Sequence, residues 1–140
     1  KVTRPRTFMF SGTYVALGFA VPAALGAKVG NPKRQVAALC GDGGFMFGCQ
    51  ELATAMQFDI PVVFVVVNDH CLTSIKGEQK RLFGARYIAV DLRNPNFAKL
   101  ADAFGVPAYR IGESDDVRPV LSEALSAGKP ALIEVRKNSS

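Results

Sequence analysis

Two aspartates, each placed just after an apolar stretch, are the residues of this sequence best suited to chemistry. Asp42 lies in the glycine turn Gly41–Gly44, and Asp69 follows the apolar run 62–67 and Asn68. A glycine turn offers backbone N–H groups to phosphate, but a carboxylate inside it repels phosphate by about 4 kcal/mol at 4 Å and an effective dielectric of 20. A divalent cation between the carboxylate and the phosphate turns this repulsion into a net attraction. Mg²⁺ suits this role because it binds one or two carboxylates together with substrate phosphates.

The spacing of the two aspartates places them at one edge of a sheet. They lie 27 positions apart (69 − 42), which is the length of one helix and one strand. Their strands can therefore be neighbours, with both side chains converging on one ion. The N–H groups of Gly43 and Gly44, at the start of a helix, can then donate to phosphate oxygens. We predict a Mg²⁺ and diphosphate site at Asp42 and Asp69.

The elements that must position these residues alternate between strands and helices. Strands are predicted over 7–10, 36–40, 62–67, 108–111 and 131–135, and helices over 16–29, 45–58, 74–80, 97–104 and 117–127. The run 62–67 has no polar alternation, which is typical of a central parallel strand buried on both faces. Asn96 and Ser114 are expected to cap the last two helices, with Asp115 and Asp116 in the first turn of the second. The fold class is α/β, a doubly wound open parallel sheet with helices on both faces.

Composition bounds the possible partners. The 140 residues are enough for one domain, and a formal net charge of +5 without basic–aromatic interleaving does not indicate nucleic-acid binding. No apolar run reaches the roughly 18 residues of a membrane span, and no signal peptide is visible. The cysteines Cys40, Cys49 and Cys71 include no CxxC pair, which favours neither disulfides nor zinc. We therefore expect a cytoplasmic protein.

A dinucleotide site is the first alternative to a metal site, and the sequence disfavours it. That site requires the spacing GxGxxG, whereas the glycines here are Gly41, Gly43, Gly44 and Gly48. No acidic residue closes a following strand at the offset expected for a ribose contact. A non-catalytic nucleotide- or phosphate-binding module of the same shape remains a second hypothesis.

The two motifs resemble those of a known family. Gly41-Asp42-Gly43, with a later strand that ends in Asn68-Asp69, resembles the cofactor motif of thiamine diphosphate-dependent enzymes. The phrases over 17–28 and 50–55 support the resemblance, which runs from about Arg6 to Val135. Within that family the chain is similar to the diphosphate-binding domain of the group that includes acetolactate synthase and benzoylformate decarboxylase.

The resemblance implies a role for each matching position. The cofactors would be thiamine diphosphate and Mg²⁺. Asp42 and Asp69 would bind the metal by side chain and Cys71 by its backbone carbonyl. The residues implied in cofactor binding are Val15, Leu17, Gly41, Asp42, Gly43, Gly44, Asp69, Cys71, Leu72, Thr73 and Ser74. In this set, the Val15 carbonyl and Leu17 amide would meet the aminopyrimidine, and amides from Leu72 to Ser74 would hold the diphosphate.

The resemblance also implies an activity and what the chain lacks. Such enzymes act on a 2-oxo acid substrate as decarboxylases or carboligases; a 2-oxo acid oxidoreductase with the same cofactor is the alternative within the class. Residues 1–140 would form a single diphosphate-binding domain and would be a piece of a longer chain. The N-terminal part of this domain and the pyrimidine-binding domain would lie outside these residues. The glutamate that activates the pyrimidine would come from the pyrimidine-binding domain of a partner subunit, in a homodimer or tetramer. We expect this chain to be inactive alone and to expose apolar surface.

Four positions depart from the family pattern. Asp69 stands where many relatives have Asn, and Thr73 where they often have Gly. Glu78 replaces a tryptophan typical of acetolactate synthases, and Leu17 replaces their methionine; both differences point away from a true acetolactate synthase.

Several other residues invite a role. His70, the single histidine, and Glu51 are better explained as surface and helix polarity than as catalysts. Ile75 and Gln79, one helical turn apart, are candidates for lining a substrate pocket, with plain packing as the alternative.

Overall fold

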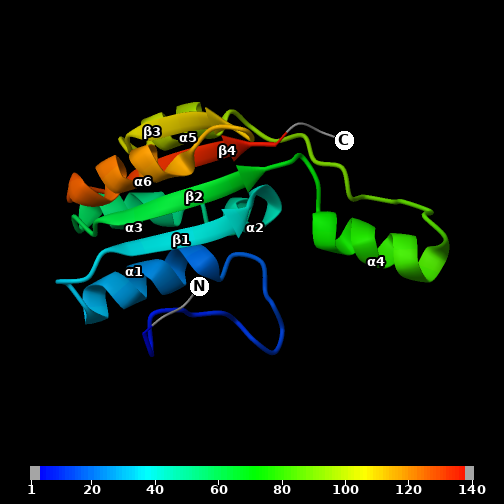
Figure 1. Cartoon of the computed structure of the whole chain (residues 1–140), viewed down its shortest axis with the longest axis horizontal. Coiled ribbons are helices and arrows are strands. Elements are labelled where there is room, and N and C mark those ends of the chain that lie inside the picture. The colour runs from blue at the N-terminus through cyan, green and yellow to red at the C-terminus, as the bar shows by residue number, and fades with distance from the viewer. Residues whose placement is uncertain (1–3, 138–140) are drawn as a thin grey trace.

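The computed structural model describes residues 4–137, so the outermost three residues of the predicted domain at each end lie outside the described range. The helices are α1 (Ala20–Gly30), α2 (Asp42–Met46), α3 (Glu51–Gln57), α4 (Thr73–Phe83), α5 (Phe97–Ala103) and α6 (Val117–Ser126). The strands are β1 (Val36–Gly41), β2 (Val62–Asn68), β3 (Ala108–Gly112) and β4 (Ala131–Arg136). They form one parallel sheet in the order β1-β2-β4-β3 (Figure 1).

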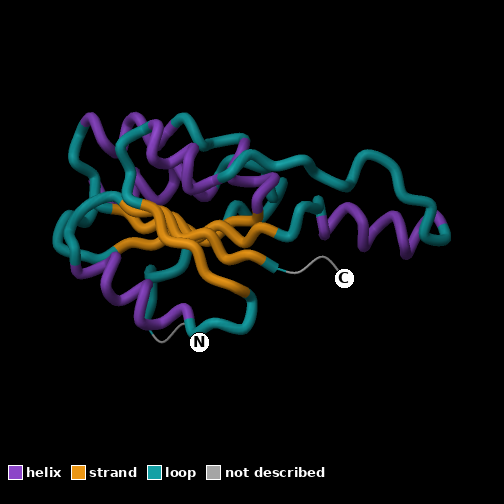
Figure 2. The backbone as a smooth tube through the Cα atoms, turned by 90° about the horizontal axis from the view of Figure 1, so that it is seen from above, coloured by secondary structure: helices purple, strands orange, loops and turns teal. Residues whose placement is uncertain are grey.

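Helices cover both faces of the sheet, as the sequence predicted. On one face, α1, α2, α3 and α5 surround a core centred on Phe64 and Leu132. The other face is covered by α6 (Figure 2). Its Ala124 belongs to a second buried cluster with Val63, Val65 and Ile133. Both faces of β2 are buried, which explains its unbroken run of apolar residues.

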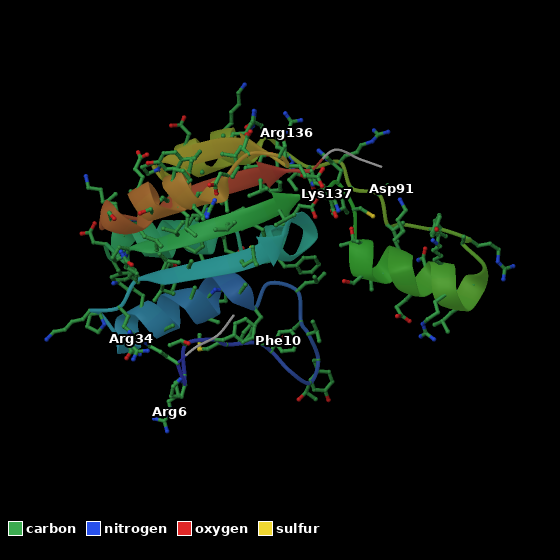
Figure 3. All side chains as sticks on the ribbon, viewed as in Figure 1. Arg6, Phe10, Arg34, Asp91, Arg136 and Lys137 are labelled. Carbon is green, nitrogen blue, oxygen red and sulfur yellow. The ribbon has the colours of Figure 1, made fainter. Side chains whose placement is uncertain are left out.

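Three predictions of local structure are wrong. Residues 7–10 form no strand, and Phe8, Met9 and Phe10 are exposed on a loop beside α1 (Figure 3). The helix predicted over 45–58 is divided into α2 and α3 by a turn.

The third error concerns the start of α6. The cap is Asp116, whose side chain accepts a hydrogen bond from the Arg118 N–H at 3.0 Å, and not Ser114. Asp115 instead accepts from the Gly112 N–H at 2.6 Å, which closes the turn before the helix. A capping aspartate therefore lies two residues nearer the helix than the predicted serine.

Helix α4 differs from the other helices in its packing. It projects away from the layered body, and none of its residues is buried (Figure 1). Local contacts hold the following segment to α4. The Lys76 ammonium lies 3.1 Å from the Asp91 carboxylate, and the Gln79 side-chain amide forms hydrogen bonds with both the N–H and the carbonyl of Ile88. Figure 3 places Asp91 on this returning segment. Among the helices of residues 4–137, none is long and apolar enough to span a membrane.

Candidate metal and diphosphate site

The carboxyl ends of β1 and β2 bring the two predicted aspartates to the same edge of the sheet. Gly41 pairs with Val67 in the parallel register. Asp42 follows Gly41 directly and Asp69 lies two residues after Val67, so both stand at the same end of neighbouring strands. The prediction that their strands are neighbours is confirmed. Ligands of open α/β sheets bind beyond this edge.

Asp42 is a buried carboxylate. It is 1% exposed, and its Oδ1 accepts a hydrogen bond from the Gly43 N–H at 2.7 Å. The Asn94 side-chain amide donates to its Oδ2 at 2.6 Å. Burial disfavours a charge unless it is well bonded, so these donors are what allow the carboxylate to remain there.

Asp69 is held by its own loop. Its Oδ1 accepts from the Cys71 N–H at 3.2 Å, and its Oδ2 accepts from the Thr73 hydroxyl at 2.5 Å. This loop passes through His70, a non-glycine residue with a φ of +57°. Thr73 and Asp69, which both depart from the family pattern, are thus joined by a hydrogen bond.

The first turn of α4 offers N–H groups next to Asp69. The helix has 11 residues, and no side chain caps its start. The N–H groups of a first turn have no partner within the helix, which leaves the amides of Thr73 and Ser74 open to an anion. The Leu72 N–H is different because it donates to the Val90 carbonyl at 2.8 Å. Of the three amides predicted to hold a diphosphate, Leu72 is thus already engaged.

The glycine turn lies close to this loop. A Cβ on Gly43 would meet Leu72 Cδ2 at 2.5 Å, so a larger residue would force the Leu72 side chain to move. On the other side, a Cβ on Gly44 would lie 3.8 Å from Leu17 Cδ2. Leu17, whose amide is predicted to meet the aminopyrimidine, therefore flanks the turn, and its side chain is half exposed.

A close backbone contact holds the Leu17 segment in place. Gly18 has a φ of +85°, and a Cβ there would meet the Phe47 carbonyl oxygen at 3.0 Å. Gly48 in turn packs against the Gly18 carbonyl. This contact also explains the turn between α2 and α3. Val15 lies three residues earlier in the same exposed loop, with a φ of +47°.

The donor set suits a hard cation better than zinc. Within the described part of the chain, no group of three or more His, Cys, Asp and Glu side chains is arranged to hold a metal. Two carboxylates and a backbone carbonyl leave other positions for water and phosphate, which is the usual environment of Mg²⁺.

The two predicted pocket residues differ in their surroundings. Ile75 is 51% exposed on the first turns of α4. The Gln79 side-chain nitrogen donates to the Ile88 carbonyl at 3.0 Å, and its oxygen accepts from the Ile88 N–H at 2.9 Å. Since both ends of this amide are engaged, packing explains Gln79 better than a substrate contact.

Four residues with side-chain roles at this edge were not predicted from the sequence: Asn68, Asn94, Arg110 and Glu134. Asn68 was noted only as part of the Asn68-Asp69 motif. Glu134 is 2% exposed and bonded to Arg110 Nε at 2.8 Å. A charged residue inside the apolar strand 131–135 was the signal for Glu134. Asn94 lies in an irregular segment, where no local pattern marks it.

Comparison with known proteins identifies the family. Residues 1–135 match the family described as "Thiamine pyrophosphate enzyme, C-terminal TPP binding domain". The chain belongs to this family. Thiamine pyrophosphate is another name for thiamine diphosphate, so the resemblance predicted from Gly41–Gly43 and Asn68-Asp69 is confirmed.

Individual members of the thiamine pyrophosphate enzyme family show a consistent likeness. The chain is 40% identical over 136 residues to a "Probable acetolactate synthase large subunit" from Methanocaldococcus jannaschii, covering 96% of this chain and 23% of the relative. It is 39% identical to the mitochondrial acetolactate synthase of Schizosaccharomyces pombe, covering 95% of this chain and 20% of that protein. The chain is thus a C-terminal cofactor-binding domain related to acetolactate synthases.

A solved structure agrees with the fold. The thiamine diphosphate-dependent 4-hydroxybenzoylformate decarboxylase of Rhodococcus jostii RHA1 superimposes with a TM-score of 0.81 at 36% identity, covering 89% of this chain and 24% of that one. The chain therefore spans less than a quarter of the length of these relatives.

Proposed function

We propose that this domain binds thiamine diphosphate through Mg²⁺ at the carboxyl edge of β1 and β2. The observation that carries the proposal is that Asp42 and Asp69 follow the same ends of the paired strands β1 and β2, beside the uncapped first turn of α4. Two carboxylates alone would repel a diphosphate, while a divalent cation between them and the phosphates makes the contact favourable.

The residues present fit such a cofactor. Asp42, Asp69 and the Cys71 carbonyl would hold the metal, while the amides of Gly44, Thr73 and Ser74 would hold the diphosphate. The Gly43 N–H already donates to Asp42 Oδ1 and would support that ligand instead. A side chain on Gly43 would collide with the Leu72 side chain, so glycine keeps the turn close to the loop before α4. The Leu17 segment would hold the organic rings through the Val15 carbonyl and the Leu17 amide and side chain. When bound, thiamine diphosphate supplies a carbanion that adds to carbonyl groups and an electron sink for decarboxylation.

For the whole protein we propose a 2-oxo acid decarboxylase or carboligase, with a 2-oxo acid oxidoreductase as the alternative. The activities by which these relatives are named support a carbonyl-directed reaction. The pyrimidine-activating glutamate would come from the pyrimidine-binding domain of a partner subunit in a homodimer or tetramer.

Exposed apolar residues support such an assembly, and we expect the 140-residue chain to have no turnover by itself. Ile75, Leu82 and Phe83 on α4 are each more than half exposed, at 51%, 56% and 54%. Apolar surface of this extent typically marks a protein interface.

Calorimetric titration with thiamine diphosphate, with and without Mg²⁺, tests the binding proposal. We expect saturable binding with Mg²⁺ and at least about a tenfold loss after chelation. ADP and NAD⁺ serve as competing ligands. Equal affinity with and without metal, or tighter binding of a dinucleotide, would favour a non-catalytic nucleotide- or phosphate-binding module instead.

A further inference from the structure

A continuous network of polar side chains links Asp42 to the other three strands. Asn94 donates to Asp42 Oδ2 at 2.6 Å and to Asn68 Oδ1 at 2.9 Å. The Asn68 amide then donates to Glu134 Oε1 at 2.8 Å, and Arg110 Nε donates to Glu134 Oε2 at 2.8 Å. Strands β2, β4 and β3 contribute the last three residues in this order, so the network crosses the sheet.

The network is buried at its centre. Asp42, Asn68 and Glu134 are 1%, 3% and 2% exposed. Throughout residues 4–137, no buried side-chain nitrogen or oxygen lacks a hydrogen-bond partner. A buried polar network stabilises a fold only when each member is bonded, and this one meets that condition.

Asp42 differs from Glu134 in how its charge is balanced. Glu134 forms an ion pair with Arg110, whereas the ion pairs found among the described residues do not include Asp42. The Asn94 amide is the side-chain donor that the structure gives to Asp42. Without a bound cation, Asn94 therefore supplies much of the compensation for burying this carboxylate.

The chemistry of the end groups determines the direction of each bond. Ionised carboxylates only accept hydrogen bonds, so Asn94 must turn its NH₂ group toward Asp42, and Asn68 must turn its NH₂ group toward Glu134. The Asn68 oxygen is then left to accept the second Asn94 N–H. Each amide thus has one orientation that satisfies the network, and the Asp42 carboxylate is held in one orientation as a result.

We propose that Asn94 is a positioning residue, which fixes the Asp42 carboxylate in the orientation that a Mg²⁺ ion requires. This inference rests on the function proposed above. Mg²⁺ requires a near-ideal octahedron, while Ca²⁺ tolerates irregular geometry. Loss of the Asn94 donor leaves Asp42 Oδ2 unheld, while the Gly43 N–H still bonds Oδ1. The freedom gained by Oδ2 weakens Mg²⁺ binding more than Ca²⁺ binding.

The test compares cation requirements in the intact protein. Thiamine diphosphate binding is measured by calorimetry over a range of Mg²⁺ and, separately, Ca²⁺ concentrations for the wild type, Asn94→Ala and Asn94→Ser. Asn31→Ala is the matched control, because Asn31 is exposed at the opposite edge and caps α1 through its backbone N–H. Thermal unfolding of each protein without ligand shows whether it is folded.

For Asn94→Ala we expect the half-saturating Mg²⁺ concentration to rise by about 10- to 100-fold, as is typical when the support of a metal ligand is removed. The Ca²⁺ requirement should change by less than about threefold, since its geometry is tolerant. Asn94→Ser, which retains one hydroxyl donor, should lie between the wild type and Asn94→Ala. The control should match the wild type.

Three results would overturn the proposal. Wild-type Mg²⁺ dependence in a folded Asn94 variant would remove the positioning role and leave the proposed function intact. Equal losses with Mg²⁺ and Ca²⁺ would mean that Asn94 supports the fold in general. A wild-type protein without Mg²⁺-dependent thiamine diphosphate binding would contradict the proposed function itself and the positioning role with it.

Discussion

Asp42 and Asp69 hold equivalent places after neighbouring strands but are supported in opposite ways. Asp42 is buried and bonded to Asn94, a residue 52 positions away (94 − 42). Asp69 is half-buried and bonded to Cys71 and Thr73 in its own loop. The first depends on the tertiary structure, whereas the second depends on one turn and the start of α4.

The site therefore has a rigid side at Asp42 and a more adaptable side at Asp69. The Asp42 side belongs to the packed body, where the sheet and its polar network limit movement. The Asp69 side leads into α4, a helix of 11 residues without a buried side chain. Short helices that lack tertiary packing are marginal in water, so ligand or partner contacts are expected to stabilise α4.

The largest effect is expected for Asp42→Ala. Removal of the buried carboxylate should lower Mg²⁺-dependent affinity for thiamine diphosphate by more than about 100-fold, beyond what loss of a supporting residue costs. The free energy of unfolding should change little, because loss of a desolvated charge offsets the lost hydrogen bonds. Calorimetry and urea unfolding measure the two quantities. An affinity within threefold of the wild type would exclude Asp42 as a metal ligand.

Glu134→Ala should affect stability more than the metal site. It leaves the buried Asn68 amide without its acceptor and Arg110 without its partner, but Arg110 is 39% exposed and can be hydrated. We expect a loss of about 2 kcal/mol in the free energy of unfolding. Glu113→Ala, on an exposed turn, is the matched control. Identical urea midpoints for the two variants would show that the network is not stabilising.

Asp69→Asn should cost less binding than any change at Asp42. The amide keeps an oxygen for the metal and removes one negative charge, so we expect Mg²⁺ to bind about tenfold more weakly and the half-saturating Mg²⁺ concentration to rise accordingly. The measurement is the Mg²⁺ concentration that gives half-maximal thiamine diphosphate binding. A loss as large as that of Asp42→Ala would mean that the two aspartates contribute equally.

Thr73→Val tests the local brace alone. It removes the hydroxyl that donates to Asp69 at 2.5 Å while the side-chain shape is kept. One neutral-to-charged hydrogen bond at an exposed position should alter Mg²⁺ affinity by about threefold. Thr54→Val, in α3 and distant from the site, is the control. A loss above about 30-fold would indicate that Thr73 fixes the whole loop.

The smallest effect is expected for the thiol reactivity of Cys40 and Cys71, which lie two residues from Asp42 and Asp69. Burial raises the pKa of the Cys40 thiol from its ordinary 9.0 to about 12, so it stays protonated in the folded protein. The unfolded chain ionises first, and Cys40 therefore lowers stability as the pH rises from about 9 toward 12. At pH 8, iodoacetamide should label Cys71 before Cys40, with mass spectrometry as the readout. Mg²⁺ and thiamine diphosphate should slow labelling of Cys71. Equal rates at both thiols would contradict the raised pKa of Cys40.

The sequence was sufficient to predict the parallel sheet and which of its edges binds ligands in this fold class. Apolar runs such as 62–67 predict buried parallel strands, and the spacing of Asp42 and Asp69 predicts neighbouring strand ends; both are confirmed. The strand predicted over 7–10 failed because local apolar character does not supply a pairing partner. The division between α2 and α3 was missed because it depends on a contact with Gly18, 30 positions before Gly48 (48 − 18).

The supporting side chains of the site were beyond sequence reasoning for the same reason. Asn94 has no periodic pattern around it, and its importance comes from Asp42 and Asn68, which lie far from it in the chain. By contrast, residues that act through local backbone were within reach, as with Asn96, which caps α5 by accepting from the Lys99 N–H as predicted. The sequence thus identifies candidate metal ligands more readily than the residues that orient them.

The strand order has a consequence for how this domain folds. Strand β4 follows the other three in the chain but lies between β2 and β3, and β3 pairs with β4 alone. The central sheet is therefore completed only after β4 is synthesised, and Glu134 arrives with it. Pairings between such distant segments form slowly because long loops must close first. A nascent chain that ends before β4 would hold Asn68 without its acceptor Glu134, so assembly of the site coincides with closure of the sheet.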